Sequence, residues 1–246
     1  MRILILLWLA ATVARADVGQ TNEDAAAILQ RVIAARPAKD FVLKARLFAT
    51  RDHEPVLLEI LAKNSPAETR TLYRSGTTEI LVVQPTNGIA RMFQKGAGEL
   101  TGAQRTASLL GSSFSIYDLA LPFLRWPAPK WIGDDRTRGR DCFAIEARAT
   151  GEPYARAKLW IDKEYCGLLR AEVFNADDAL VKRFAVTSFR KIGDVWVPRG
   201  LEMASVPAGQ ALPAQEKSRL EVYDGDYDAR VPEELFAIER FAAAPR

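Results

Sequence analysis

Few residues of this chain could carry out catalysis. Its 246 residues include a single histidine, His53, in a charged turn between Arg51 and Pro55. A nucleophilic serine or cysteine needs a base such as histidine within reach of its side chain. Residues 111–115, Gly-Ser-Ser-Phe-Ser, come near a G-x-S-x-G elbow but lack its final glycine. We interpret them as a loop that leads into a helix, and we predict no catalytic residue and no enzymatic activity.

Metal binding has equally little support in the sequence. Zinc sites use three or four cysteine, histidine or carboxylate ligands. Asp224, Asp226 and Asp228 have the alternate spacing of a calcium loop. An EF-hand loop that starts at Asp224 needs glycine at position 229 and glutamate at position 235, where this chain has Ala229 and Leu235. We interpret the three aspartates as a polar turn and expect no metal and no other cofactor.

The N-terminus has the pattern of a secretory signal peptide. Arg2 precedes an apolar run over residues 3–13, and alanines stand at positions 14 and 16. The run is shorter than the stretch of about 20 apolar residues that spans a bilayer. We therefore expect residues 1–16 to be removed after Ala16, and residues 17–246 to form one exported domain.

The charge balance excludes one class of partner. The chain has 34 basic and 31 acidic residues, and two of the basic ones, Arg2 and Arg15, lie in the expected signal peptide. The mature protein is therefore close to neutral. Proteins that bind nucleic acids carry a strongly basic, clustered surface, so we expect no nucleic acid as a partner.

Most of the mature chain has the hydrophobic period of β-strands. In residues 41–49 the odd positions are apolar, while Lys44 and Arg46 point to the other side. This alternation is typical of an antiparallel sheet with one apolar face and one hydrated face. The pattern predicts eleven strands, over residues 41–50, 55–63, 68–75, 78–84, 88–95, 140–149, 155–162, 168–175, 179–191, 195–206 and 216–224.

Three helices are predicted to cover the apolar face. An amphipathic helix over residues 25–35 precedes the strands, and a second helix over residues 115–125 lies between the fifth and sixth strands. A third, over residues 232–241, has Pro232 at its first position. A sheet of this size curls and must bury its apolar face. The sequence therefore predicts a mainly β protein whose curved sheet is covered by a few helices.

An apolar concavity that short helices fill incompletely is suited to a lipid-like ligand. The candidate lining residues are apolar ones of three predicted strands: Phe41, Leu43, Leu47, Phe143, Ile145, Leu159 and Ile161. The candidate lid residues come from the central helix and its approach: Phe114, Ile116, Leu119 and Phe123. The alternative is that all of these residues form an ordinary core beneath the helices.

Four segments resemble a known family. Residues 110–119, 139–146, 159–163 and 196–199 resemble the corresponding segments of outer-membrane lipoprotein-sorting proteins of the LolA type. The resemblance covers about residues 41 to 236. It implies an unclosed, half β-barrel of about eleven antiparallel strands whose mouth is plugged by helices. It also implies that acyl chains bind between the sheet and the helices.

The resemblance implies a function as well. We expect a periplasmic carrier that takes a lipoprotein or lipid from an inner-membrane transporter and delivers it to an outer-membrane acceptor, acting as a monomer. The alternative is a regulatory sensor with the same fold, which binds lipid and controls a membrane partner. A further alternative is an accessory protein of a membrane exporter.

The two cysteines could form a disulfide in an exported protein. If the turn over residues 149–154 pairs Arg148 with Ala155, then Cys142 lies opposite Ile161. Cys166 lies in the next turn at the same end of the sheet. We therefore predict a Cys142–Cys166 disulfide, with free thiols as the alternative.

Overall fold

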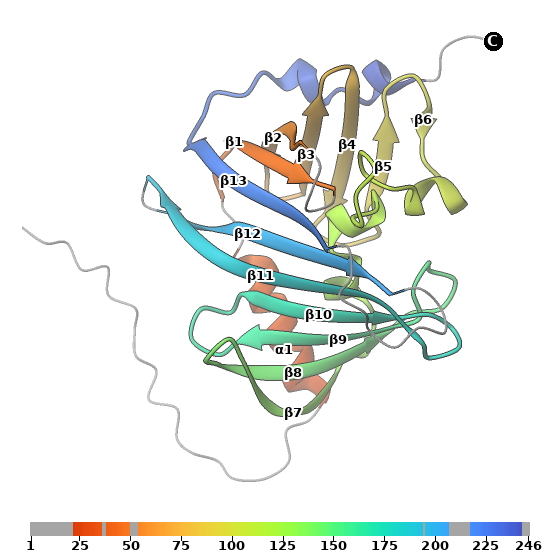
Figure 1. Cartoon of the computed structure of the whole chain (residues 1–246), viewed down its shortest axis with the longest axis vertical. Helices are drawn as coiled ribbons and strands as arrows, with labels where there is room; N and C mark the ends of the chain where they lie inside the picture. The colour runs from red at the N-terminus through yellow and green to blue at the C-terminus, as the bar shows by residue number, and fades with distance from the viewer. Residues whose placement is uncertain (1–21, 36–37, 50–53, 194, 207–216, 243–246) are drawn as a thin grey trace, which may run out of the picture.

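The computed structural model describes residues 22–35, 38–49, 54–193, 195–206 and 217–242. Within these residues the chain forms one antiparallel sheet of thirteen strands, one α-helix and five short 3-10 helices (Figure 1). No helix in this part of the chain is long and apolar enough to cross a membrane. The expected signal peptide, residues 1–16, and His53 lie outside the described residues.

The elements follow one another in a long meander. The first half of the sheet contains β1 (Phe41–Phe48), β2 (Val56–Asn64), β3 (Glu68–Ser75), β4 (Thr78–Pro85), β5 (Arg91–Gln94) and β6 (Gly98–Glu99). The second half contains β7 (Lys130–Thr137), β8 (Arg140–Arg148), β9 (Arg156–Asp162), β10 (Leu168–Phe174), β11 (Leu180–Ile192), β12 (Val195–Ser205) and β13 (Lys217–Tyr227). The helices are α1 (Asn22–Ala34), η1 (Gly102–Thr106), η2 (Tyr117–Ala120), η3 (Pro122–Arg125), η4 (Glu233–Phe236) and η5 (Ile238–Phe241).

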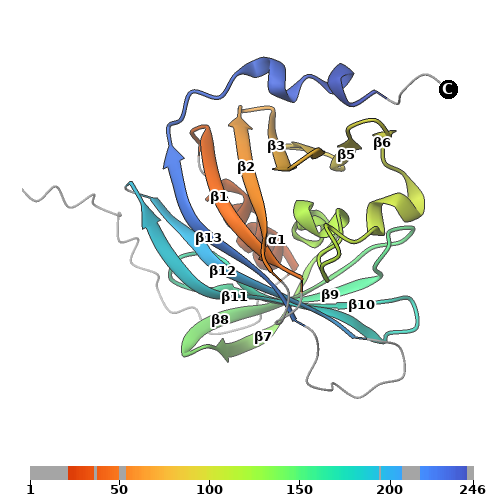
Figure 2. The ribbon, with the colours of Figure 1, turned by 45° about the horizontal axis from the view of Figure 1, so that its top comes forward.

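The strand order explains why the sheet stays open. It runs β6-β5-β4-β3-β2-β1-β13-β12-β11-β10-β9-β8-β7, so β6 and β7 lie at opposite edges although they are consecutive in the sequence. The connection over residues 100–129 therefore has to run from one edge of the sheet to the other (Figure 2). Figure 1 shows β2–β5 at a steep angle to β8–β12, as expected for a strongly twisted sheet. The predicted unclosed antiparallel sheet is confirmed, with thirteen strands instead of eleven.

The larger of the two additional strands, β7, lies between the predicted helix over residues 115–125 and the predicted strand over residues 140–149. It pairs with β8 from Lys130 opposite Glu146 to Thr137 opposite Arg140, with a register shift next to Gly133. Gly133 has φ +134°, a conformation that other residues rarely adopt. This bulge interrupts the alternation of apolar and polar residues by which strands are recognised, which is why β7 was missed.

The prediction of one continuous helix over residues 115–125 is wrong. The segment forms two single-turn 3-10 helices, η2 and η3, separated by Leu121 in the left-handed conformation with φ +45°. Proline disfavours the helical conformation of the residue before it and cannot donate a backbone hydrogen bond. Pro122 therefore ends the first helix at Leu121 and begins the second.

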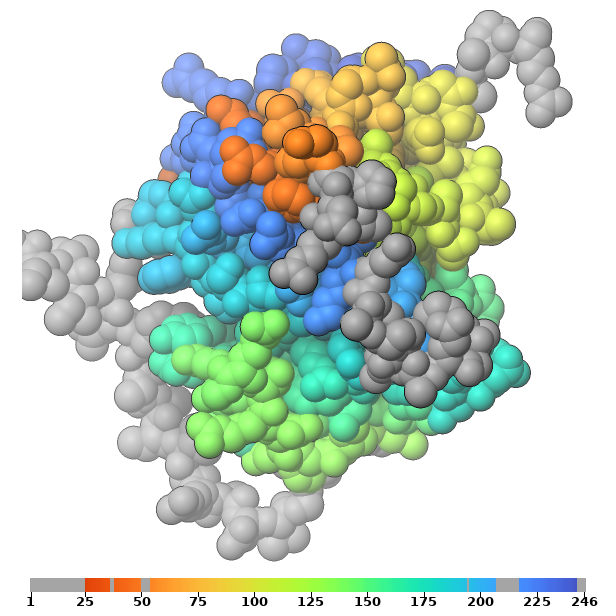
Figure 3. Space-filling view, viewed as in Figure 1, coloured from red at the N-terminus to blue at the C-terminus, as the bar shows by residue number. Residues whose placement is uncertain are grey.

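The segment predicted as a C-terminal helix, residues 232–241, also forms two 3-10 helices, η4 and η5. It was expected to cover the apolar face of the sheet that carries the main core, but it covers the opposite face. Val231, Phe236 and Phe241 pack on the side of β2–β5 opposite the main core. Figure 3 shows this C-terminal segment in blue against the orange and yellow strands. We call this group the outer cluster, made of Leu61, Leu72, Leu81, Val83, Phe93, Val231, Phe236 and Phe241.

Candidate functional site

All seven predicted lining residues share one face of the sheet, here called the inner face. Leu43, Leu47, Ile145, Leu159 and Ile161 are buried in the main core cluster. The two phenylalanines, at positions 41 and 143, are partly buried and pack against that cluster. The alternation of the strands thus placed these side chains on a common face, although β1 is separated from the paired strands β8 and β9 by four other strands of the sheet.

Two segments cover the inner face. One is α1, whose Ala25, Ile28 and Leu29 are buried in the main core cluster. The other is the segment over residues 108–126, here called the lid. Its Phe114, Ile116 and Phe123 are buried in the same cluster, and Leu119 packs against it. The structure therefore brings the predicted lid and lining residues into contact within one core.

One narrow crevice lies beside the lid. A crevice of about 60 Å³ opens between β4–β5 and η2–η3, and Ile89, Met92, Pro122 and Trp126 supply its apolar wall. Sites for drug-sized ligands usually measure about 300–1,000 Å³. The crevice is too small for an acyl chain, so a chain that enters between these elements must displace part of the lid.

A buried polar cluster fastens the lid to the sheet. Asp118 of η2 forms an ion pair with Lys182 of β11, and only 3% of the Asp118 side chain and 14% of the Lys182 side chain are exposed. Tyr154 donates its hydroxyl to Asp118 Oδ1 at 2.9 Å, and the Ser115 N–H donates to Oδ2 at 2.7 Å. Burial, together with the charge of Asp118, raises the pKa of Tyr154 above its ordinary value. The phenol therefore stays protonated and remains a donor.

A second group of polar contacts holds the lid at the crevice. The Arg105 guanidinium lies 2.6 Å from a carboxylate oxygen of Glu152 and stacks 4.6 Å from the centre of the Tyr117 ring. Tyr117 donates its hydroxyl to Glu152 at 2.7 Å. From β4, Gln84 donates to the carbonyl oxygen of Ala120 at 2.7 Å. Both groups bond to fixed points of the sheet and its hairpins, so they define one closed position of the lid.

Residues 111–115 have a structural role in the lid. The Ser112 hydroxyl donates to the Leu109 carbonyl oxygen at 2.7 Å, and the Ser113 N–H donates to the Ser218 hydroxyl at 2.7 Å. The interpretation of Asp224, Asp226 and Asp228 as a polar turn is wrong for the first two, which lie in β13 and pair with β1. Asp224 accepts a bond there from Lys44 at 3.1 Å. In the described residues no group of three histidine, cysteine or acidic side chains is placed to hold a metal ion.

The structure does not contain the predicted disulfide. Cys142 and Cys166 are both free thiols. The register that we assumed is displaced by one residue, because Arg148 pairs with Arg156 and Cys142 therefore lies opposite Asp162. Cys142 is buried on the outer face beside Trp160 and Leu169, whereas Cys166 lies in the β9–β10 turn with φ +52°.

Asp162 shapes that turn. Its carboxylate accepts two bonds from Arg140, at 2.7 and 3.1 Å, and two from the backbone N–H groups of Glu164 and Tyr165 at 2.9 and 2.8 Å. Burial opposes its ionisation, but these hydrogen bonds prevail and hold its pKa below the ordinary value. The aspartate within residues 159–163, one of the segments that resembled the sorting proteins, is thus a structural residue of the hairpin.

The polar cluster under the lid was missed in the sequence. A signal was present, because Lys182 shares its side of the strand with Phe184 and Val186, which are buried. A lysine on the apolar face of a strand requires a partner. Its partner Asp118 lies 64 residues away, and no local pattern connects the two.

Comparisons with known proteins agree with this architecture. A family model described as "-like: Uncharacterized protein" matches residues 96–242. Among solved structures, a domain assigned as an outer membrane lipoprotein-sorting protein from Vibrio parahaemolyticus has a TM-score of 0.77 and 16% sequence identity, covering 89% of this chain and 98% of that one. A DUF1329 family protein from Desulfovibrio piger has a TM-score of 0.75, 16% identity and the same coverages of 89% and 98%.

A LolA superfamily protein from Nitrosomonas europaea has a TM-score of 0.56 and 18% identity, covering 87% of this chain and 97% of that one. No curated protein sequence matches the chain. At these identities the structural likeness establishes a shared fold, and the family model covers more than half of the chain. The chain therefore belongs to the family that this model describes, and its fold is that of the LolA-like lipoprotein-sorting proteins.

Proposed function

We propose that residues 17–246 form a periplasmic carrier that holds the acyl chain of a lipoprotein or lipid between the inner face of the sheet and the lid. In this proposal the signal peptide is cleaved after Ala16. A transporter of the inner membrane supplies the cargo, and an acceptor at the outer membrane receives it. The carrier works as a monomer and catalyses no reaction.

The observation that carries the proposal is the construction of the lid. It lies on a continuous apolar face, but it consists of two single-turn helices, η2 and η3, instead of a long α-helix. Apolar packing is not directional. An acyl chain that replaces Phe123 or Ile116 on the sheet exchanges one set of apolar contacts for another, at small net cost.

The polar cluster is suited to a lid that opens. When the opening lid carries Asp118 away from Lys182 of β11, the two residues lose their ion pair, but both charges recover the hydration that burial had removed. The removal of two charges from water offsets much of the attraction within a buried ion pair. Opening is therefore less costly than the number of bonds suggests, while the closed position stays well defined.

The energetics of transfer favour a carrier over a permanent binder. Burial of an acyl chain yields about 0.8 kcal/mol per CH₂ relative to water. Relative to a membrane the gain is close to zero, because both surroundings are apolar. A protein with this inner face shields the chain from water and still releases it to another apolar site.

Native mass spectrometry of the protein purified from a periplasmic extract tests the proposal. We expect an adduct whose extraction into organic solvent yields a phospholipid, an acylated peptide or a lipoprotein fragment. A mass that corresponds to the protein alone, together with no binding of a fluorescent fatty acid, would mean that the lid fills the inner face permanently. The carrier proposal would then be wrong.

Two matched variants show whether the inner face is the binding site. Phe123 of the lid and Phe236 of the outer cluster are 2% and 0% exposed. Replacement of either by leucine should lower the free energy of unfolding by about 1 to 2 kcal/mol. Phe123→Leu also weakens the closed lid, so it should tighten binding of the fluorescent fatty acid by about tenfold. Phe236→Leu should leave that affinity unchanged, and equal effects of the two variants would contradict an inner-face site.

A further inference from the structure

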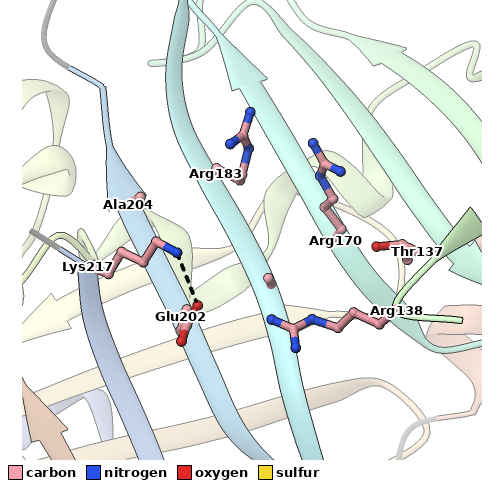
Figure 4. A pocket seen from close by; sticks show the side chains of 8 residues that line it. Thr137, Arg138, Arg170, Arg183, Glu202, Ala204 and Lys217 are labelled. Carbon is pink, nitrogen blue, oxygen red and sulfur yellow. Dashed lines mark ion pairs between the residues drawn. The ribbon is translucent and has the colours of Figure 1, made fainter. Parts of the chain in front are cut away.

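A depression on the outer face of the sheet has no part in the proposed acyl site. Its volume is about 210 Å³, and it is lined by residues of β10, β11, β12, β13 and the β7–β8 hairpin (Figure 4). It is larger than the crevice under the lid, although it lies on the opposite face. Five of its eight lining residues carry a charge.

The depression exists because two short side chains form its floor. Ala185 of β11 lies opposite Arg170 of β10. Ala204 of β12 lies between Arg183 and Lys217 in the register of the sheet. Long side chains thus surround two alanines, and a space opens between them. This space lies on the outer face of the sheet and takes no part in the packing of the core. It is therefore a candidate binding site.

The surroundings carry an excess of positive charge. Arg138, Arg170, Arg183 and Lys217 line the depression together with one acidic residue, Glu202. Lys217 Nζ lies 3.8 Å from the Glu202 carboxylate, beyond hydrogen-bond distance. Figure 4 shows this pair at one side and the three arginines around the rest of the space.

Glu172 holds two of the arginines in place. Its Oε1 atom accepts hydrogen bonds from Arg170 and from Arg183 Nε, the latter at 3.0 Å. Trp160 supports Arg170 further, because the guanidinium carbon lies 4.3 Å from the centre of the indole ring. These contacts fix the two guanidinium groups in position without neutralising all four cations of the depression.

Some hydrogen-bond donors of the arginines that line the depression have no partner among the described residues. Arg170 Nε is buried and has no hydrogen-bond partner among the described residues. Arg138, in the β7–β8 turn with φ +50°, forms no ion pair within the described part of the chain. Figure 4 shows its side chain reaching across β11 toward the depression. The donors of Arg138 are therefore available to an acceptor bound in the depression.

We propose that this depression binds a phosphate group. The planar fork of donors on arginine matches the oxygens of phosphate, and such charge-assisted bonds are stronger than neutral ones. Three guanidinium groups and one ammonium group suit the charge of a phosphate better than that of a single carboxylate. The phosphate belongs either to a free phosphate compound or to the headgroup of an anionic phospholipid. The site is independent of the acyl carrier proposal, because it uses none of the lid or lining residues.

The test uses the double variant Arg138→Gln, Lys217→Gln and a control with the same loss of charge. The control, Lys44→Gln with Arg148→Gln, removes two exposed cations of the outer face that do not line the depression. Binding is measured at one ionic strength, for inorganic phosphate by titration calorimetry and for vesicles of phosphatidylglycerol and phosphatidylcholine by co-sedimentation. Vesicles of phosphatidylcholine alone provide the baseline.

We expect the depression variant to bind phosphate-containing ligands about 30-fold more weakly, because each lysine or arginine near an anionic surface contributes about one kcal/mol. The control should stay within about threefold of the wild-type protein. Binding of inorganic phosphate identifies a free phosphate compound as the ligand, and binding of the anionic vesicles alone identifies a headgroup. The proposal is overturned if the wild-type protein binds neither, or if the control loses as much affinity as the depression variant.

Discussion

Replacement of Lys182 by methionine should leave a buried carboxylate without its counter-charge. Methionine has nearly the length of lysine but carries no charge, so the variant isolates the electrostatic contribution. In the wild-type protein Asp118 is 3% exposed and receives Lys182 as its ion-pair partner. After the change it keeps only the hydrogen bonds from Tyr154 at 2.9 Å and from the Ser115 N–H at 2.7 Å.

The magnitude follows from these contacts. Removal of one partner of a buried ion pair costs about 3–5 kcal/mol. Asp118 retains two hydrogen bonds, and 14% of the Lys182 side chain is exposed, so we expect the lower end, about 3 kcal/mol. The double variant Asp118→Asn, Lys182→Met removes both charges and should lose only about 1 kcal/mol, as for a hydrogen bond. The second substitution should therefore restore about 2 kcal/mol.

Urea unfolding measures these differences, and hydrogen exchange shows where they arise. The increased exchange should be concentrated in residues 108–126, because the lost ion pair fastens the lid. Lys44→Met, which removes an exposed partner of Asp224, should leave both the unfolding midpoint and the exchange unchanged. A Lys182→Met protein as stable as the wild-type protein would refute a stabilising role of the ion pair, and so would a double variant less stable than either single variant.

Three further predictions concern the framework. The pKa of Asp162 in the folded protein lies below its ordinary value of 3.8. Its carboxylate therefore stabilises the fold above pH 3.8, and this stabilisation is lost as the pH falls through the folded-state pKa. In urea unfolding from pH 6 down to about pH 3, Asp162→Asn should lose less unfolding free energy than the wild-type protein. Burial raises the pKa of the Cys142 thiol, so a thiol reagent should modify Cys166 first, and mass spectrometry of digested protein should find Cys142 unmodified until the protein unfolds. A Cβ atom on Gly225 would lie 2.9 Å from the Val42 carbonyl oxygen, so Gly225→Ala should lower the unfolding free energy by about 1–3 kcal/mol in the same urea assay.

The arrangement of the strands was readable because most of them alternate. Each of Phe41, Leu43 and Leu47 on β1 was placed on the correct face from the period alone, and the same holds for β8 and β9. The period fails where the backbone departs from regular pleating. At Gly133 a bulge hides β7, and a hairpin register shifted by one residue moved Cys142 from opposite Ile161 to opposite Asp162.

The segments that cover the two faces of the sheet were harder to predict than the strands. The pattern of residues 115–125 is that of a helix, and only Pro122 signals the break that Leu121 makes in the structure. The position of the C-terminal segment could have been suspected from β4, whose residues 79–84 are all buried. A run that is apolar on both sides of a strand indicates cover on both faces, and the outer cluster provides the second cover.

The most direct test of the account maps where an acyl chain lies. The protein is produced in cells supplied with a fatty acid that carries a photoreactive diazirine near its end, irradiated, digested and analysed by mass spectrometry. We predict crosslinks to inner-face residues such as Ile145 and Leu159 and to Phe123 of the lid, with none to the outer cluster. Crosslinks confined to the outer cluster or to exposed surface, or a protein that takes up no label although it is folded, would contradict the claim that the lid and the inner face form a binding site.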